Sequence, residues 1–505
     1  MMYYIKKIKK INWYVVGNVI GYALLVEAGL LLFPLLVNFI YRENVGIPYL
    51  ITIVICAAVG FSLSRLHNKE KNFIFARDGL FATGLVWIFM SMLGALPFFL
   101  SGEIPNYIDA VFETVSGFTT TGSSILTDIE SLSHANLFWR SFTHWIGGMG
   151  VLVFVLAIVP KSNDQTMHIM RAEAPGPSIG KLVPRLRQSA MILYEIYMVM
   201  TVVLILLLWV GGMPFFDSCC HAFGTAGTGG FSIKGAGIAY YDSVYIDVVI
   251  TVFMLLFGVN FNMYYFLLIK EYRQVYKNEE LRTYLGIVVA CIIAIAINIY
   301  PLYESVGQSL RYSAFQVGTI ITTTGYATAN FDLWPTFSKI ILWLLMVLGA
   351  SAGSTGGGIK VSRFLIIMKK LKLDIHRLVH PQKVDAITMD GKVVDDEIVR
   401  QITAYFCCFM MITFGCILIV SLDGFDFEST VTSVFACIGN IGPGFGICGP
   451  TGNFYAFSYL SKIVLSFAML IGRLEIYPII IFLFPLIRLP KAIRPKKKKK
   501  QYDKV

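Results

Sequence analysis

The stretch Thr119-Thr120-Thr121-Gly122-Ser123 lies between two long apolar segments, and the chain repeats it in three further versions. Each version follows a short amphipathic run, so the repeated unit reads as a helix, a half-helix, a loop and a second helix. The aligned glycines lie 108, 95 and 117 residues apart, which indicates internal duplication of one unit. The other versions are Gly227-Thr228-Gly229-Gly230-Phe231, Thr322-Thr323-Thr324-Gly325-Tyr326 and Gly439-Asn440-Ile441-Gly442-Pro443.

The composition places the chain in a membrane. Hydrophobic residues make up 56% of its 505 residues and charged residues 14%, against about 25% in soluble domains. Mean hydropathy is +0.68, and apolar runs near the roughly 20 residues that cross a bilayer recur along the whole length. We therefore expect an all-α polytopic membrane protein with two N-terminal transmembrane helices, over 11–40 and 48–66, followed by four helix–pore loop–helix repeats in a pseudo-four-fold ring.

The chain divides at its polar connectors. Four lysines precede the first apolar run, as in a signal peptide, but the run reaches about residue 40 and is too long for a cleaved signal core. We interpret it as a retained first helix. The expected units are the two N-terminal helices (1–77), repeat one with its linker (78–188), repeat two (189–282), repeat three with a glycine-rich loop and a linker (283–398), repeat four (399–488) and a basic tail (489–505).

The distribution of positive charge predicts the orientation. The formal net charge of +11 could suggest nucleic acid as a partner, but 35 of the 42 Lys and Arg residues fall in six connecting or terminal segments. That asymmetry follows the positive-inside rule and places both termini in the cytoplasm, with no nucleic-acid partner. The six segments are 1–10, 64–78, 161–188, 270–282, 360–400 and 488–505.

The repeated stretches have the chemistry of an ion filter. Small and glycine residues let backbone carbonyls take the place of the water around a cation, and irregular backbone is tolerated inside a membrane where it lines a cavity. Neutral oxygens suit K⁺, and no Asp or Glu occurs in any of the four strings. The alternative is four glycine-rich helix kinks. The candidate filter residues are Thr119, Thr120, Thr121 and Gly122; Gly227, Thr228, Gly229 and Gly230; Thr322, Thr323, Thr324 and Gly325; and Gly439, Asn440, Ile441 and Gly442.

Two further features recur in the repeats. An acid stands at the expected start of three half-helices, where it suits the helix dipole; these acids are Asp109, Asp217 and Glu428, whereas repeat three carries Gln308, Ser309 and Arg311. A glycine also follows each filter by 24 to 30 residues in the second helix. These glycines are Gly147-Gly148, Gly258, Gly349 and Gly472.

A glycine-rich segment interrupts the apolar span 336–368. That span has 33 residues, against the roughly 20 needed to cross, so it fits a helix–loop–helix inside the membrane. A simple kink and a nucleotide P-loop are the alternatives. A P-loop is rejected because Ile359 separates Gly358 from Lys360 and no Ser or Thr directly follows the lysine. The candidate loop residues are Gly349, Ser351, Gly353, Ser354, Thr355, Gly356, Gly357 and Gly358.

Arg473 lies in the middle of the last apolar span. A centred arginine costs about 2.5–3.5 kcal/mol on insertion scales, so we expect it to face the interior of the bundle and a partner. An interhelical salt bridge, for example with Glu475, is one interpretation. We expect Arg140, beside Trp139, to be an interfacial anchor. His376 and His380 have the spacing of metal ligands but lack a third ligand, and the nine cysteines read as small hydrophobes.

The filters resemble those of the Trk/Ktr/HKT superfamily of potassium transporters. Gly227 to Ser232 and Asn440 to Gly444 are similar to the second and fourth filters of that family, in the same order along the chain. The two leading helices and the chain length favour its bacterial TrkH-like branch, and the resemblance is firmest over 78–488. Some relatives that carry sodium have Ser at the first filter glycine. Because Gly122 is present here, the match favours potassium.

This resemblance implies potassium uptake across a bacterial inner membrane, with K⁺ as the transported ion and no covalent cofactor. It implies that the 349–358 loop is an intramembrane gate and that Arg473 lies beneath the filter. It also implies a homodimer and a cytosolic RCK-type nucleotide-binding regulatory subunit, with 161–188 and 369–398 as plausible docking surfaces, besides contact with membrane lipid.

Two other classes of protein are weighed against a pore. An ion-coupled symporter with alternating access would usually show two-fold inverted repeats, whereas the four repeats here are parallel. A membrane enzyme would need a cluster of His, Cys or acidic residues in the spans or a Ser–His–Asp arrangement, and the sequence offers neither. We therefore expect a transporter and not an enzyme.

Overall fold

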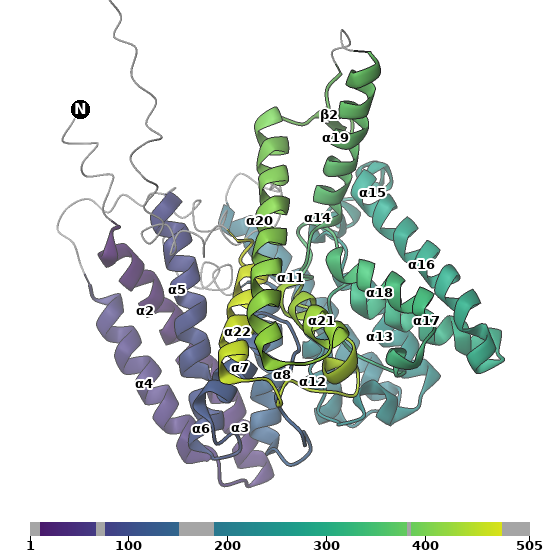
Figure 1. The fold of residues 1–505 in the computed structure, drawn as a ribbon. Helices are drawn as coiled ribbons and strands as arrows, with labels where there is room; N and C mark the ends of the chain where they lie inside the picture. Colours follow the sequence, from purple (N-terminus) through teal and green to yellow (C-terminus); the bar gives the residue numbers. More distant parts are fainter. Residues whose placement is uncertain (1–10, 67–75, 151–185, 381–384, 477–505) are drawn as a thin grey trace, which may run out of the picture.

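The computed structural model describes residues 11–66, 76–150, 186–380 and 385–476, and the statements below concern these ranges. Within them the regular secondary structure is helical, apart from a short antiparallel hairpin of β1 (Thr388–Met389) and β2 (Lys392–Val393) and one isolated bridge. Helices α19 (Val361–Val379) and α20 (Asp396–Val420) rise above the others and carry the hairpin between them (Figure 1). We call this end the connector side and the opposite end the loop side.

The N-terminal helices pack through glycine. α2 (Trp13–Leu30) and α3 (Leu32–Tyr41) form one span of 29 residues, and α4 (Gly46–Ser64) returns beside it, as the sequence predicts. A Cβ at Gly21 would lie 2.7 Å from the Gly60 carbonyl oxygen, and one at Gly60 would lie 2.9 Å from that of Gly21. The two backbones therefore touch, which is how apolar helices gain contact in the absence of a hydrophobic driving force.

Each repeat begins with a spanning helix and continues with a short pore helix. Three of the pore helices have 12 residues and one has 16; at 1.5 Å per residue, 12 residues cover only about half of a bilayer. The first helices are α5 (Ala76–Gly94) with its extension α6 (Leu96–Leu100), α11 (Leu186–Val210), α16 (Glu279–Tyr303) and α20. The pore helices are α7 (Tyr107–Phe118), α12 (Phe215–Ala226), α17 (Val306–Ile321) and α21 (Phe427–Ile438).

The second helix of every repeat ends or breaks at its glycine. α8 (His134–Gly148) ends at Gly147-Gly148, and α22 (Tyr459–Arg473) ends just after Gly472. α13 (Val244–Phe257) and α14 (Phe261–Leu268) meet at 91° across Gly258, and the segment that contains Gly349 separates α18 (Thr336–Val347) from α19. The remaining elements are α15 (Tyr272–Lys277) and the 3₁₀ turns η2 (Gly237–Tyr241), η3 (Phe331–Leu333), η4 (Ser421–Asp423) and η5 (Gly446–Cys448).

The sequence predicts ten spanning helices, two at the N-terminus and two in each repeat, with an interruption in the span 336–368. The described part of the chain contains six helices that are long and apolar enough to cross a membrane, or seven if the bent pair counts as one, and residues 151–160 and 477–488 of the predicted second helices lie outside it. The glycines let the described second helices approach the pore helices. A Cβ at Gly147 would lie less than 3.0 Å from the Phe118 carbonyl oxygen, and one at Gly472 equally close to that of Ile438.

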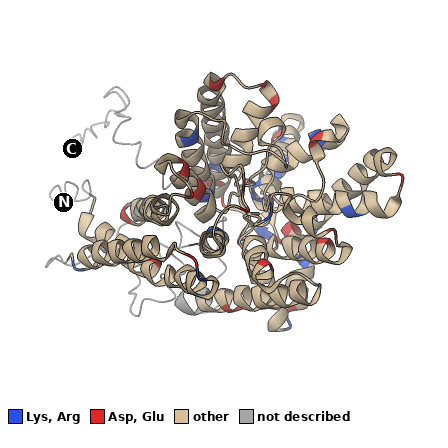
Figure 2. Cartoon of the chain, turned by 90° about the horizontal axis from the view of Figure 1, so that it is seen from below, with Lys and Arg blue, Asp and Glu red and all other residues tan. Residues whose placement is uncertain are grey.

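Charged residues are sparse on the long helices. Figure 2, which views the chain from the loop side, shows mostly uncharged ribbon with Lys, Arg, Asp and Glu scattered along it. Long helices present large apolar side chains outward, and Val199, Ile297 and Met411 are more than half exposed. An outer surface of this kind is stable in lipid and would be a large apolar patch in water.

Candidate functional site

The four pore helices end in the same backbone motif at the filter stretches. In each, the first filter residue is the helix C-cap and the second is in the left-handed region, with φ between 54° and 58°. The N–H of the third residue donates to the carbonyl five residues earlier at 2.8 Å in all four repeats. These are Schellman motifs, and they turn the chain sharply away from the helix axis. The left-handed residues are Thr120, Thr228, Thr323 and Asn440.

The fourth filter residue is the aligned glycine, and its φ is also positive. The values are 83°, 72°, 88° and 99° for Gly122, Gly230, Gly325 and Gly442. Each filter therefore contains two left-handed residues, at its second and fourth positions. Non-glycine residues pay about 1–2 kcal/mol in this region, so the strain at the second position has to be supported by the surrounding fold.

The filters meet each other in a closed cycle. A Cβ at Gly122 would lie less than 3.0 Å from the Gly229 carbonyl oxygen, in the filter of the next repeat. The same holds from Gly230 to Thr324, from Gly325 to Ile441 and from Gly442 back to Thr121. In every case the neighbour is the third residue of the next filter. The four stretches are thus adjacent around one centre, and only glycine fits at the fourth position.

The residues that follow the glycines interlock with the preceding repeat. Phe231 is bonded to α8, because its N–H donates to His144 Nε2 at 3.2 Å. Tyr326 donates its hydroxyl to the carbonyl of His221 at 3.0 Å, and Ser123 donates to that of Gly442 at 3.0 Å. Repeats one, two and four therefore each hold the filter of a neighbour, which helps to fix the spacing of the ring.

The filters present mainly backbone carbonyl oxygens as possible ligands for an ion. Within the described ranges, the carbonyls of the second, third and fourth filter residues accept no protein hydrogen bond, apart from that of Gly442. Buried carbonyls are nearly always paired with protein, water or a ligand. The threonine hydroxyls are less available: Thr119 bonds the Val115 carbonyl and Thr121, and Thr322 bonds the Gly318 carbonyl and Thr324.

A cavity opens from the filters toward the loop side. It has a volume of about 160 Å³, and all four filter glycines lie in its lining together with the loops that follow them. The opposite end of the filter stretches, formed by their first residues, continues into the pore helices. The filters therefore separate this cavity from the centre of the bundle.

Arg140 lies behind the first two filters and not at a membrane interface, so the expectation of an interfacial anchor is wrong. The side chain is 2% exposed and donates from Nε to Glu113 at 2.6 Å and from Nη1 to the Ser232 carbonyl at 2.7 Å. Its guanidinium also stacks 3.5 Å from the centre of the Phe231 ring. Glu113 in turn accepts the Ile125 N–H at 2.9 Å. The pair thus ties the segments after filters one and two together.

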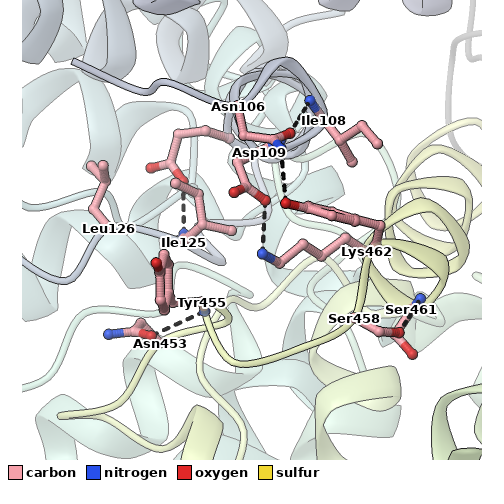
Figure 3. A network of polar contacts seen from close by, with 12 residues as sticks. Asn106, Ile108, Asp109, Ile125, Leu126, Asn453, Tyr455, Ser458, Ser461 and Lys462 are labelled. Carbon is pink, nitrogen blue, oxygen red and sulfur yellow. Dashed lines mark hydrogen bonds and ion pairs between the residues drawn. The ribbon is translucent and has the colours of Figure 1, made fainter. Parts of the chain in front are cut away.

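A second buried ion pair links the first and last repeats. Lys462 of α22 donates to Asp109 of α7 at 2.7 Å, and both residues are buried. Figure 3 shows the lysine pointing at the carboxylate, near Asn106, whose side chain caps α7. Sequence reasoning placed Asp109 at a helix start but missed its partner. The signal was available, because a lysine in an apolar span is expensive without a counter-charge.

The other acids of the pore helices have individual roles. Asp217 and Glu428 lie in the first turns of α12 and α21, as predicted, and the first turn of α17 has no acid. Arg311 of α17 pairs instead with Asp247 of α13 at 2.7 Å. The charge arrangement therefore differs from repeat to repeat, although the backbone does not.

The glycine-rich loop lies against the filters on the side away from the cavity. The Gly357 N–H donates to Thr323 Oγ1 at 2.6 Å, and a Cβ at Gly357 would lie 2.6 Å from the Gly439 carbonyl oxygen. A Cβ at Gly356 would lie 3.0 Å from the Thr322 carbonyl oxygen. The loop also bonds the break in the second helix of repeat two, where Ser351 donates to the Gly258 carbonyl at 3.1 Å.

Arg473 joins this loop to the first repeat. It donates from Nη1 to the Thr355 carbonyl at 2.7 Å and from Nη2 to the carbonyls of Gly147 and Gly148 at 2.5 and 2.8 Å. The interpretation of a salt bridge with Glu475 is wrong, because Glu475 pairs with Arg363 of α19. A cation on α22 therefore connects repeats one, three and four directly beneath the filter ring.

The two histidines of α19 lie apart from this centre, whereas Asn440 is part of it. His376 stacks on His380 on α19, and His376 Nδ1 lies 3.6 Å from Asp385; within the described ranges no three His, Cys, Asp or Glu residues are grouped as a metal site. Asn440 donates to Thr121 Oγ1 and to the Met469 carbonyl, both at 2.9 Å, while its Oδ1 accepts no hydrogen bond from the described residues.

Comparisons with known proteins agree with this architecture. The TrkH family model, described as a cation transport protein, matches residues 47–492. The Trk system potassium uptake protein TrkH of Salmonella typhimurium is 34% identical over 476 residues, which cover 93% of this chain and 98% of that protein. TrkG of Escherichia coli is 33% identical over 472 residues, covering 92% and 97%. The crystal structure of the potassium transporter TrkH from Vibrio parahaemolyticus matches with a TM-score of 0.84 and 30% identity, covering 94% of this chain and 99% of that one.

Proposed function

The chain belongs to the TrkH family of cation transport proteins, and on that premise we propose that it takes up potassium through a pore at the centre of the four filter stretches. The observation that carries this proposal is the closed cycle of filters, in which every aligned glycine faces the next stretch. Potassium enters from the loop-side cavity and exchanges its water for backbone carbonyls. Relatives that are named potassium uptake proteins, at 34% identity over most of the chain, support potassium as the ion.

The chemistry of the ring favours potassium over more strongly hydrated ions. Its oxygens are neutral carbonyls, and the filter stretches contain no carboxylate. The pore helices point their C-terminal ends at the ring, and each contributes roughly half a negative charge from its dipole. The ring attracts a cation in this way without an ionised ligand that would favour divalent ions.

The intramembrane loop and Arg473 form the gate in this proposal. The loop occupies the space next to the first residues of filters three and four, and the guanidinium lies where an ion that leaves the filter would pass. A fixed positive charge at that point raises the energy of a potassium ion. Opening then requires the loop to move and the arginine to leave its three carbonyl partners.

The setting of the pore follows from the family resemblance. We propose that the protein lies in the bacterial inner membrane with both termini in the cytoplasm, that it works as a homodimer, and that a cytosolic RCK-type nucleotide-binding subunit acts on the gate. The hairpin of β1 and β2 and helix α19 extend on the connector side, which offers such a subunit a surface.

Flux in liposomes tests the proposed function. Purified protein in liposomes loaded with potassium is expected to take up ⁸⁶Rb⁺ rapidly, at the same rate whether or not the pH gradient is clamped, because a pore needs no coupling ion. Liposomes without protein, and vesicles with sodium in place of potassium inside, are the controls. Uptake that strictly requires a proton or sodium gradient would instead support an alternating-access symporter.

A further inference from the structure

Glu280 is a buried carboxylate at the start of α16 that the pore itself does not use. The side chain is 5% exposed and comes from the first helix of repeat three, outside the filters. One oxygen, Oε1, accepts the N–H of Ala352 at 2.7 Å and the N–H of Ser362 at 3.0 Å. A single atom therefore binds both ends of the segment 352–362, which contains most of the glycine-rich loop.

The two ends of the loop also touch each other. Leu348 and Ile359 form an isolated parallel bridge, in which the Gly349 N–H donates to the Ile359 carbonyl at 2.7 Å and the Val361 N–H to the Ala350 carbonyl at 3.2 Å. We call these residues, 348–350 and 359–361, the neck of the loop. Glu280 lies at this neck and adds two charge-assisted bonds to the neutral bridge.

Glu280 is negatively charged, unlike the other groups that hold the loop. Within the described ranges, the remaining hydrogen bonds between the loop and other elements involve neutral groups, which are the backbone near Gly258 and the Thr323 hydroxyl, and the cation Arg473. A bond to an ionised carboxylate is roughly twice as strong as a neutral one. Loss of the charge at residue 280 would therefore weaken the neck more than loss of any one neutral contact.

The neighbouring acid provides a contrast. Glu279 is adjacent in sequence but faces the connector hairpin: it pairs with Lys369, and it accepts the Asp390 N–H at 3.1 Å. It contacts no residue of the loop in the described structure. Two glutamates in the first turn of α16 thus bind different elements, and a helix-dipole effect common to both cannot explain the contacts of Glu280 alone.

We propose that Glu280 is a positioning residue of the gate, whose carboxylate keeps the neck closed and the loop under the filters. This inference rests on the proposed function, because it assumes that the loop obstructs ion flow. A pore without this carboxylate should open more often, while its filters, which Glu280 does not touch, should select ions as before.

The test compares Glu280→Gln with the matched control Glu279→Gln in proteoliposomes. Glu280→Gln keeps the shape of the side chain, and we expect basal ⁸⁶Rb⁺ uptake to rise about tenfold, as for loss of roughly one charge-assisted bond, with an unchanged potassium-to-sodium ratio. Glu279→Gln is expected to leave both unchanged. The double variant Glu280→Gln/Arg473→Ala should show less than the product of the two single effects, since both release one loop.

A second variant protects the test against misfolding. Ser362→Pro removes the N–H that Glu280 accepts and lies in the first turn of α19, where proline is tolerated, so uptake should again rise. Unchanged uptake in both variants, or a fall, would overturn the proposal; a fall with a lowered melting temperature would indicate a structural role, and a fall without it a role in attracting cations. If the parent protein takes up no ⁸⁶Rb⁺, the proposed function fails, and this inference fails with it.

Discussion

Replacement of Gly122 by serine is expected to lower the ratio of potassium to sodium uptake by about tenfold or more, because the added side chain meets the next filter and strains its own backbone. Gly122 has a φ of 83°, and its Cβ would lie less than 3.0 Å from the Gly229 carbonyl oxygen. The backbone has to shift, and the carbonyl that shifts with it is one of the proposed ion ligands.

The measurement compares ⁸⁶Rb⁺ and ²²Na⁺ uptake by the parent and the variant in liposomes. Gly102→Ser is a matched control, since Gly102 also has a positive φ, of 77°, but a Cβ there would have no atom within 4 Å. This control carries the same backbone cost without the collision and should keep the parental ratio. An unchanged ratio in Gly122→Ser, with normal expression, would count against a ring of carbonyls as the source of selectivity.

Removal of the Arg473 side chain is expected to raise potassium flux by about tenfold or more. The guanidinium makes three bonds to main-chain carbonyls at the loop and at the end of α8, and bonds to charged groups contribute about 1.5–3 kcal/mol each. Arg473→Ala removes these bonds together with the positive charge beneath the filters. A deletion within 351–357, which shortens the loop itself, should have the same direction of effect.

The flux assay uses proteoliposomes without any cytosolic partner, so that only the intrinsic gate is tested. Arg65→Ala is the control, because Arg65 is an exposed arginine that stacks on Phe61 at 4.1 Å, away from the filters. It should leave the flux unchanged. A fall in flux for Arg473→Ala at normal expression would mean that the arginine serves assembly of the bundle rather than closure.

The filter register could be predicted from sequence because the physics is local. Small residues at the end of a half-helix, with glycine three positions after the helix cap, give the same turn in all four repeats. The left-handed residue at the second filter position could not be predicted, since Thr120, Thr228 and Thr323 are β-branched, and β-branched residues seldom adopt a positive φ. The close contact between neighbouring filters supports a strain that the local sequence disfavours.

Partners across repeats could not be predicted, because they depend on packing between distant segments. The neighbouring Trp139 favours a place at the membrane interface for Arg140, yet Arg140 pairs with Glu113 in the interior. Proximity along the chain favours Glu475 as the partner of Arg473, yet α22 ends at Arg473, Glu475 lies beyond it with a φ of 57°, and Glu475 pairs with Arg363. The need for a partner was correctly inferred in the case of Arg473, but its nature, main-chain carbonyl oxygen, was not.

The breaks in the second helices were only partly visible in the sequence. The segment around Gly349 was recognised because it contains many glycines and lengthens an apolar span beyond need. The 91° bend near Gly258 was not, since a single glycine is compatible with a straight helix. Its cause is tertiary: the Gly353 carbonyl of the loop accepts the Phe261 N–H at 3.0 Å, which holds the start of α14 beside the loop.

The central claim is that carbonyls of four duplicated stretches together replace the water of one potassium ion. Anomalous diffraction from crystals grown in Rb⁺ measures this most directly, because it locates the ion without reference to protein density. The account predicts a peak on the common axis at the level of the filter residues 119–122, 227–230, 322–325 and 439–442. Strong peaks elsewhere in the membrane region, with none among these stretches, would contradict it.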